Sequence, residues 1–227
     1  MEIVKLTAIM DAPIVQMSPL HLDALLTAVH PAMHNQAHCP VRADTTRSGL
    51  SPVPLPLLSA YCGSTWVWAA TAAEYPDCAA LSTSTITRRT DHHDVLYLQR
   101  KVTPSVGPMK DRMIKSVVIM TPEVWFYAAT NNTKELMRII QRVNAIGGLR
   151  KDGYGSVREW RLEKSAICPH EILAQDGHAR RRLPQALCEN EAYKRLAIYP
   201  PYWMAADAPF GFEVGDAVAL REEVKFR

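Results

Sequence analysis

The sequence lacks the features that would indicate a disulfide framework, a zinc knuckle or a membrane segment. Its five cysteines are scattered and none forms a C-x-x-C pair, which favours a reducing compartment. No apolar run approaches the roughly 20 residues that a membrane helix needs. The N-terminal segment carries Glu2, Lys5 and Asp11 where a signal peptide would be apolar. We therefore expect a cytoplasmic protein with no membrane partner, no metal and no other cofactor.

A large excess of charge of one sign is also missing. The formal net charge is only +3 over 227 residues, so nucleic-acid binding would have to come from a local basic stripe. The hydrophobic fraction of 48% is ordinary for a globular protein, and the length allows a substantial buried core.

Hydrophobic spacing predicts an α+β chain with the order β-α-β-β-α-β. Short apolar and partly aromatic runs predict buried strands, and Thr121-Pro122-Glu123 interrupts one strand pair. The expected strands are 3–10, 57–61, 65–70, the pair within 113–129, 157–162 and an edge strand or short tail element at 214–220; the expected helices are 18–30, capped by Ser18, and one from Asn132 to a C-terminal glycine, Gly147. This order indicates a ferredoxin-like (RRM-like) core over 1–165, with 166–227 as a C-terminal extension packed on it.

Two segments interrupt that core. Residues 31–60 are rich in proline, which predicts an insertion; His30, His34, His38 and Cys39 lie at or within it, but Pro31 and Pro40 limit a helical metal site. Residues 84–115 predict a projecting basic hairpin, or thumb. Its cations are Arg88, Arg89, Arg100, Lys101, Lys110, Arg112 and Lys115.

The most distinctive stretch is Ile146-Gly147-Gly148-Leu149-Arg150-Lys151-Asp152-Gly153-Tyr154-Gly155-Ser156-Val157. It holds four of the chain's 10 glycines and lies between a predicted helix and a predicted strand. Glycine allows positive φ and close backbone approach, and Arg150 and Lys151 add positive charge. A loop of this kind is suited to a phosphodiester backbone.

Three phosphate or RNA motifs can be compared with this loop. A P-loop fails because Tyr154 and Gly155 stand where Lys and Ser/Thr are required. A dinucleotide fingerprint fails because Arg158 replaces its last glycine and the order is helix then strand. The RNP1 pattern of RNA-recognition modules fits only in part, which does not favour base stacking on the sheet.

The loop resembles the glycine-rich loop of the RAMP proteins of CRISPR systems, in which it lies before the last strand of the core. The segments Ala12-Pro13-Ile14-Val15 and Pro19-Leu20-His21-Leu22-Asp23 are similar to RAMP openings, particularly those of type IV. The resemblance implies a RAMP fold and an RNA-binding subunit of a CRISPR ribonucleoprotein effector complex. Size, the single loop and the basic hairpin best suit the Cas five-type subunit, which caps the 5′ handle of the guide RNA.

The same resemblance implies the partners and the site. The partners would be guide RNA, a backbone RAMP subunit and a large subunit, with target DNA next to the protospacer as a further candidate. The expected RNA-binding residues are Gly147, Gly148, Arg150, Lys151, Gly153, Tyr154, Gly155, Arg158, Arg88, Arg89, Arg100, Lys101, Lys110 and Arg112.

Two other functions stay open. A metal-independent endoribonuclease that processes guide-RNA precursor would need a general base, for which His21, His92 and His93 are the candidates. A protein-interaction module without RNA contact is the third interpretation. A second basic cluster, His178-Ala179-Arg180-Arg181-Arg182, is typical of a solvated surface, with a nucleic-acid role as the alternative.

Overall fold

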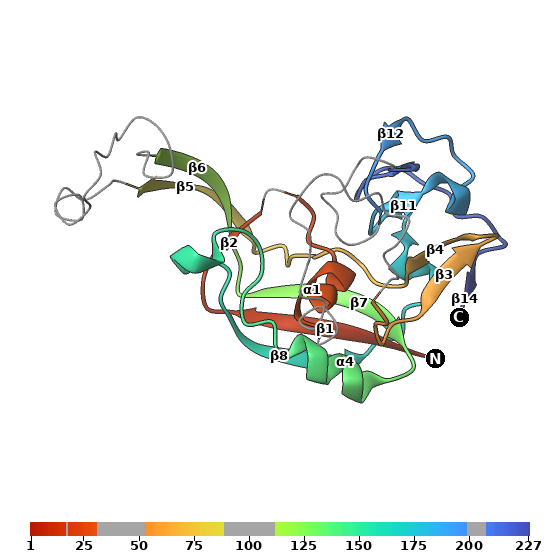
Figure 1. Cartoon of the computed structure of the whole chain (residues 1–227), viewed down its shortest axis with the longest axis horizontal. Coiled ribbons are helices and arrows are strands. Elements are labelled where there is room, and N and C mark those ends of the chain that lie inside the picture. The colour runs from red at the N-terminus through yellow and green to blue at the C-terminus, as the bar shows by residue number, and fades with distance from the viewer. Residues whose placement is uncertain (17, 31–52, 89–111, 199–207) are drawn as a thin grey trace, which may run out of the picture.

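The computed structural model describes the chain except for residues 17, 31–52, 89–111 and 199–207, and its class is mixed α+β (Figure 1). Most of the described part consists of small antiparallel sheets, together with two α-helices. The predicted α+β class is therefore confirmed.

A three-stranded antiparallel sheet of order β7-β1-β8 forms the centre of the molecule (Figure 1). Its strands are β1 (Glu2–Met10), β7 (Glu123–Thr130) and β8 (Val157–Lys164), close to the predicted ranges. Val4, Leu6 and Ala8 alternate along β1 and are fully buried on one face. Single bridges from Ala70 to Ala128 and from Glu74 to Trp125 add the segment 70–74 at the outer edge of β7.

Both helices cover the buried face of this sheet. The helices are α1 (Leu22–Val29) and α4 (Thr133–Ile140), and their Leu26 and Ile139 side chains belong to the same core as Leu6. The predicted cap of α4 is confirmed, because the Asn132 side chain accepts a hydrogen bond from the Glu135 backbone N–H at 3.0 Å.

Two predicted helix ends are wrong. The helix predicted to begin after Ser18 begins at Leu22, because the preceding segment is extended: Leu20 O accepts from the Ala73 backbone N–H, and His21 bridges to Ala72. The second helix ends at Ile140 and not at Gly147, since the intervening residues turn and Ala145 bridges to Ser156.

Two paired strands lie at the position of the predicted hairpin and extend beyond its predicted base, while residues 89–111 between them lie outside the described part of the chain. Strands β5 (Ala80–Arg88) and β6 (Arg112–Met120) pair antiparallel, and Figure 1 shows them extending away from the central sheet. The short strand β2 (Ile14–Val15) pairs with the base of β6. We call the β2-β6-β5 sheet the arm.

The C-terminal extension builds a second core with a hairpin from the first half of the chain. Strands β3 (Ser59–Cys62) and β4 (Thr65–Trp68) pair with each other, and β3 also pairs with β14 (Lys225–Phe226). This second core combines Ala60 and Val67 with C-terminal residues such as Leu183. The other small elements are η3 (His170–Ile172), β9 (Ala174–Gln175), β10 (His178–Ala179), β11 (Leu183–Pro184), η4 (Gln185–Leu187), β12 (Lys194–Arg195) and β13 (Phe210–Phe212).

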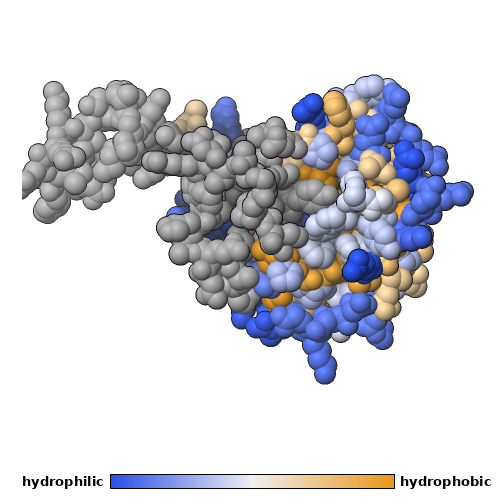
Figure 2. Space-filling model, turned by 45° about the vertical axis from the view of Figure 1, so that its right-hand side comes forward, coloured by the Kyte–Doolittle hydropathy of each residue, from blue (hydrophilic) through white to orange (hydrophobic). Residues whose placement is uncertain are grey.

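Of the two alternatives predicted for 214–220, an edge strand or a short tail element, the strand is not formed: Ala217 and Leu220 make only isolated bridges, and the nearby strand is β13. Figure 2 shows one face of the molecule, on which hydrophilic residues cover much of the described surface and hydrophobic residues lie between them. No helix in the described part of the chain has the length and apolar character needed to span a membrane.

Candidate nucleic-acid interface

The glycine loop is anchored to the segment that enters the arm. The Gly148 backbone N–H donates to Val15 O at 2.7 Å, and the Gly155 N–H donates to Pro13 O at 2.8 Å. A Cβ on Gly155 would lie 1.8 Å from Ile146 O, and one on Gly147 would lie 2.6 Å from Val15 O. Both glycines also have positive φ, so no other residue fits these two positions without strain.

The tip of the loop is free of such packing. Gly153 has a φ of +86°, and a Cβ at this position would have no described atom within 4 Å. Leu149, at the other end of the tip, also has a left-handed backbone, and η2 (Arg150–Asp152) between them is exposed. Within the described residues, neither Arg150 nor Lys151 forms a side-chain hydrogen bond or an ion pair, so both cations face solvent.

The loop and the arm meet in two places. The Tyr154 and Ser84 hydroxyls are 2.6 Å apart, which joins the loop to β5. Val15 lies between Val118 of β6 and Gly148 of the loop, pairing with one and bridging to the other. The structure therefore brings the predicted loop and the predicted hairpin together at the base of the arm.

Only some of the cations predicted for the hairpin lie in the described part of the chain. Arg88 and Arg112 occupy opposite positions in the last described pair of β5 and β6. Lys115 is exposed on the same strand pair. Arg89, Arg100, Lys101 and Lys110 lie outside the described residues.

Arg158 is a predicted site residue that already has a partner. Its Nε donates to Asp11 Oδ1 at 2.7 Å, and both side chains are exposed. Asp11 also joins the loop through its backbone N–H, which donates to Ser156 O at 2.9 Å. Arg158 therefore helps to fix the loop end of β1, and a phosphate would have to compete with a carboxylate for it.

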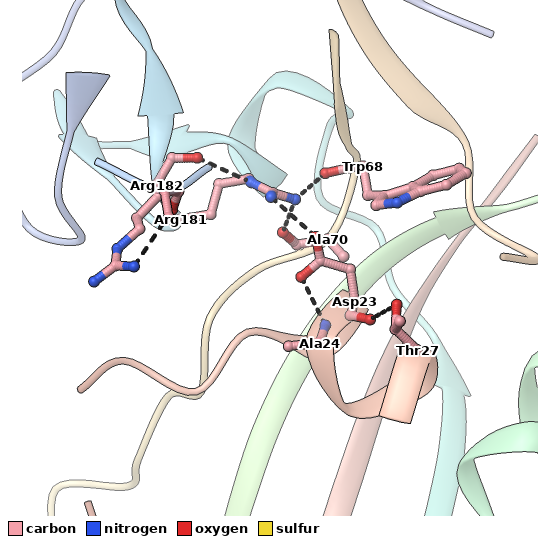
Figure 3. Close-up of polar contacts among 8 residues, drawn as sticks. Asp23, Ala24, Thr27, Trp68, Ala70, Arg181 and Arg182 are labelled. Carbon is pink, nitrogen blue, oxygen red and sulfur yellow. Dashed lines mark hydrogen bonds and ion pairs between the residues drawn. The ribbon is translucent and has the colours of Figure 1, made fainter. Parts of the chain in front are cut away.

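The second basic run, Arg180-Arg181-Arg182, is not exposed in the way the loop tip is. Arg181 is fully buried, contrary to the expectation of a solvated surface. Its Nη2 donates to Asp23 Oδ2 of α1 at 3.2 Å, while Nη1 donates to Ala70 O at 3.1 Å and to Trp68 O (Figure 3). Asp23 is itself buried, and its Oδ1 accepts from the Ala24 backbone N–H at 3.0 Å. The guanidinium thus ties the C-terminal extension to α1 and to the segment that follows β4.

The two neighbouring arginines are also engaged within the protein. Arg180 donates through Nε and Nη2 to the two carboxylate oxygens of Glu74, each at 2.7 Å, and lies 4.5 Å from the centre of the Tyr127 ring. Arg182 donates to Glu213 at 2.8 Å. The run 180–182 is therefore a structural connection, and the prediction of a solvated surface is wrong for it.

The histidines proposed for catalysis differ in location. His21 is 2% exposed at the start of α1, and burial, then the nearby Arg181 and Arg182, lower its pKa well below the ordinary value of 6.5. His92 and His93 lie outside the described residues, as do His34, His38 and Cys39 of the proline-rich insertion.

Two features of this region are not evident from the sequence. The first feature is the ion pair between Asp23 and Arg181, which are separated by 157 intervening positions. In the sequence, Asp23 is only an acidic residue in the first turn of a predicted helix. The sequence marks Trp125 only as a strand residue, although its indole belongs to none of the buried clusters in the described part of the chain.

Comparison with known proteins adds no assignment: no family model and no curated protein sequence matches the chain. The geometry of the loop and the arm therefore carries the functional argument.

Proposed function

We propose that this chain is an RNA-binding subunit of a CRISPR ribonucleoprotein effector complex, resembling the Cas five-type subunit of type IV, and that it caps the 5′ handle of the guide RNA. The RNA backbone would lie along the tip of the glycine loop and the base of the arm. Its partners would be the backbone RAMP and large subunits, and the arm would reach target DNA next to the protospacer.

One observation carries this proposal. A cationic loop tip, Arg150 and Lys151, has no protein partner in the described part of the chain, and it is fixed beside the arm by the Tyr154–Ser84 hydrogen bond. Because the rest of the loop is anchored, the tip is held in place without being covered. Phosphates bind well to such fixed cations and to exposed backbone N–H groups.

The order of the elements supports the finer assignment of a ferredoxin-like fold. Reading from one edge, the central sheet runs β8, β1, β7 and then the segment 70–74. The helix α1 lies between β1 and that segment in sequence, and α4 lies between β7 and β8. A β-α-β-β-α-β chain with both helices on one face has this arrangement.

The proposal assigns no catalytic step. A general base must reach the 2′-hydroxyl that it activates. His21 lies in the interior, against the backbone of Ala72. An endoribonuclease would therefore depend on His92 or His93, and incubation of the protein with repeat RNA and a chelator tests that alternative directly.

The test of the loop is RNA binding as a function of salt, measured by fluorescence anisotropy with a labelled single-stranded guide RNA. Each phosphate contact to single-stranded RNA contributes about 0.7 to the slope of log K against log salt concentration. The Arg150→Ala/Lys151→Ala variant should therefore bind more weakly to all sequences and show a slope lower by about 1 to 1.5.

The matched control is Lys134→Ala/Arg142→Ala, which removes two exposed cations that precede the glycine loop in sequence, one within α4 and one just after it. It should leave the slope unchanged. An unchanged slope in the loop variant, or an equal fall in both variants, would exclude the loop from the interface.

The complex is tested by copurification. A tagged chain expressed with its neighbouring genes should bring down a discrete short RNA and further subunits. Recovery of protein subunits without RNA would favour the interaction module, and cleavage of repeat RNA that disappears in His92→Ala or His93→Ala would favour the endoribonuclease.

A further inference from the structure

The central sheet has a second face that the helices do not cover. On this face the register aligns Thr7 of β1 with Trp125 of β7 on one side and with Arg161 of β8 on the other. Lys5, two residues earlier on β1, places its Nζ 3.8 Å from the centre of the Trp125 ring. The row therefore combines an indole and two cations around Thr7, which is itself buried.

Among the described residues, the C-terminal extension covers only one end of this face. Ile172 packs there with Ala129, and Ile3 and Tyr127 border that cluster. Trp125 is absent from this cluster and from the two larger cores of the described chain. A tryptophan on a half-covered sheet, outside these cores, is a candidate for contact with another molecule.

The indole also has an unsatisfied polar group. Trp125 Nε1 is buried and has no hydrogen-bond partner among the described residues. Buried indole N–H groups normally find an acceptor, and leaving one without a partner costs about 1–3 kcal/mol.

The chemistry of the row fits a nucleotide. Every base has a π face that stacks on an indole, and an ammonium beside the ring suits the attached phosphate. Carboxylates border the row on both sides: Glu159 pairs with Arg161 at 2.9 Å and Glu163 lies opposite Lys5, while Glu74 bridges to Trp125 and pairs with Arg180, and Glu123 lies two residues before Trp125 on β7. Lys5 is the cation beside the ring, so it is the group that would take the phosphate.

The row is also close to the loop interface. Thr7 lies four residues before Asp11, which is hydrogen-bonded to the loop; at about 3.3 Å per strand residue this is about 13 Å. This distance reaches the anchored base of the loop at Ser156, and Lys151 of the cationic tip lies five residues before Ser156 in the chain.

We propose that Trp125, with Lys5, forms a stacking site for one unpaired RNA base next to the phosphates held by the glycine loop. The RNP1 comparison, which did not favour stacking on the sheet, concerned the loop and the start of β8, whereas Trp125 lies on β7. This inference rests on the proposed function, because it takes RNA as the ligand. The base stacks on the face of the indole, the in-plane N–H donates to an oxygen of the neighbouring sugar, and Lys5 leaves the ring to bind the phosphate.

The first test uses the whole purified chain and single-stranded RNA carrying 5-bromouridine, with near-ultraviolet crosslinking and mass spectrometry. Adducts should appear on the peptide that contains Trp125. Adducts confined to the glycine loop would overturn the stacking site and leave the proposed function intact. Absence of adducts from both regions would count against both.

The second test measures affinity for the same RNA. Trp125→Leu should weaken binding about tenfold or more, since loss of one aromatic platform removes a stacked base. Trp125→Phe should retain most of the affinity, and Lys5→Met should lower the salt slope by about 0.7. Tyr193→Leu is the matched control, because Tyr193 is 86% exposed and is followed by Lys194 and Arg195.

Each outcome distinguishes the two proposals. Unchanged affinity in Trp125→Leu together with weaker binding in Arg150→Ala/Lys151→Ala overturns only the stacking site. Equal losses in Trp125→Leu and Tyr193→Leu show unspecific stacking and also overturn it. If Trp125→Leu fails to fold, Lys5→Met and the crosslink on the unmodified chain decide. Loss of a protein subunit from the complex with RNA binding retained would overturn the stacking site and assign the face to a protein partner.

Discussion

Two basic runs of this chain look alike in sequence and differ in structure. Arg150 and Lys151 lie on an exposed loop tip, while the run 180–182 is buried or paired with Asp23, Glu74 and Glu213. The difference comes from what the fold brings near each run. Carboxylates and carbonyl oxygens surround the second, whereas the first faces solvent beside the arm. A basic run in a sequence therefore indicates a binding site only when the structure shows that its side chains are not paired within the protein.

The largest effect is expected at Arg181. The Arg181→Met variant removes the guanidinium and leaves the buried Asp23 carboxylate without its ion pair. Breaking a buried pair in this way costs about 3–5 kcal/mol. Urea unfolding followed by circular dichroism should show this loss in the free energy of unfolding.

A double-mutant cycle with Asp23→Asn sharpens this prediction. The two changes together should cost clearly less than the sum of the single changes, because each single change already breaks the same pair. A loss below about 1 kcal/mol in Arg181→Met would remove the distinction between the two basic runs.

Much of the fold follows from local patterns, and this explains which predictions were confirmed. Alternating side chains predict β1, and the Asn132–Glu135 cap predicts the start of α4. The predicted ends at Ser18 and Gly147 were wrong because backbone partners distant in sequence, at residues 71–73 and 156, take over there. Local sequence patterns do not predict backbone pairings of this kind.

The same limit applies to the site. The exposure of the loop tip could be predicted, because glycine and charge are properties of the segment itself. The burial of Arg181 could not, since it depends on Asp23 and on the carbonyl groups of residues 68 and 70. The row formed by Lys5, Trp125 and Arg161 depends on strand register, which the pattern of each strand leaves open.

The next largest effect separates the two parts of the glycine loop. In Gly155→Ala the new Cβ would lie 1.8 Å from Ile146 O at a φ of +69°, so close contact and backbone strain add to a loss of about 2–4 kcal/mol. Gly153→Ala meets open space at a φ of +86° and should cost only about 1 kcal/mol. Urea unfolding of the two variants under identical conditions provides the measurement.

Equal losses in these two variants would contradict the division of the loop into an anchored base and a free tip.

A smaller effect is expected from acidification, through His21. Its pKa lies well below 6.5 in the folded chain, because of burial and the nearby Arg181 and Arg182. Below about pH 6.5 the unfolded chain binds a proton at this position and the folded chain does not. Stability should therefore fall with decreasing pH, by up to about 1.4 kcal/mol per pH unit, until the folded pKa is reached.

The His21→Gln variant isolates this contribution from those of the carboxylates. Its stability should change less between about pH 7 and about pH 5.5 than that of the unmodified chain, and the two should run parallel above about pH 7. Identical profiles over the whole range would show that burial and the nearby cations do not act on His21.

The smallest effect on stability is expected where the proposed effect on RNA binding is greatest. The Arg150→Ala/Lys151→Ala variant removes two cations that have no protein partner among the described residues, so its free energy of unfolding should change by no more than about 0.5 kcal/mol. Urea unfolding checks this on the same samples that are used for RNA binding. A loss as large as that of Arg181→Met would mean that the loop tip is a structural element, and weaker RNA binding could then reflect misfolding. An unchanged stability with weaker binding would assign the tip to the ligand, because a residue that contributes nothing to folding and much to binding acts at the interface itself.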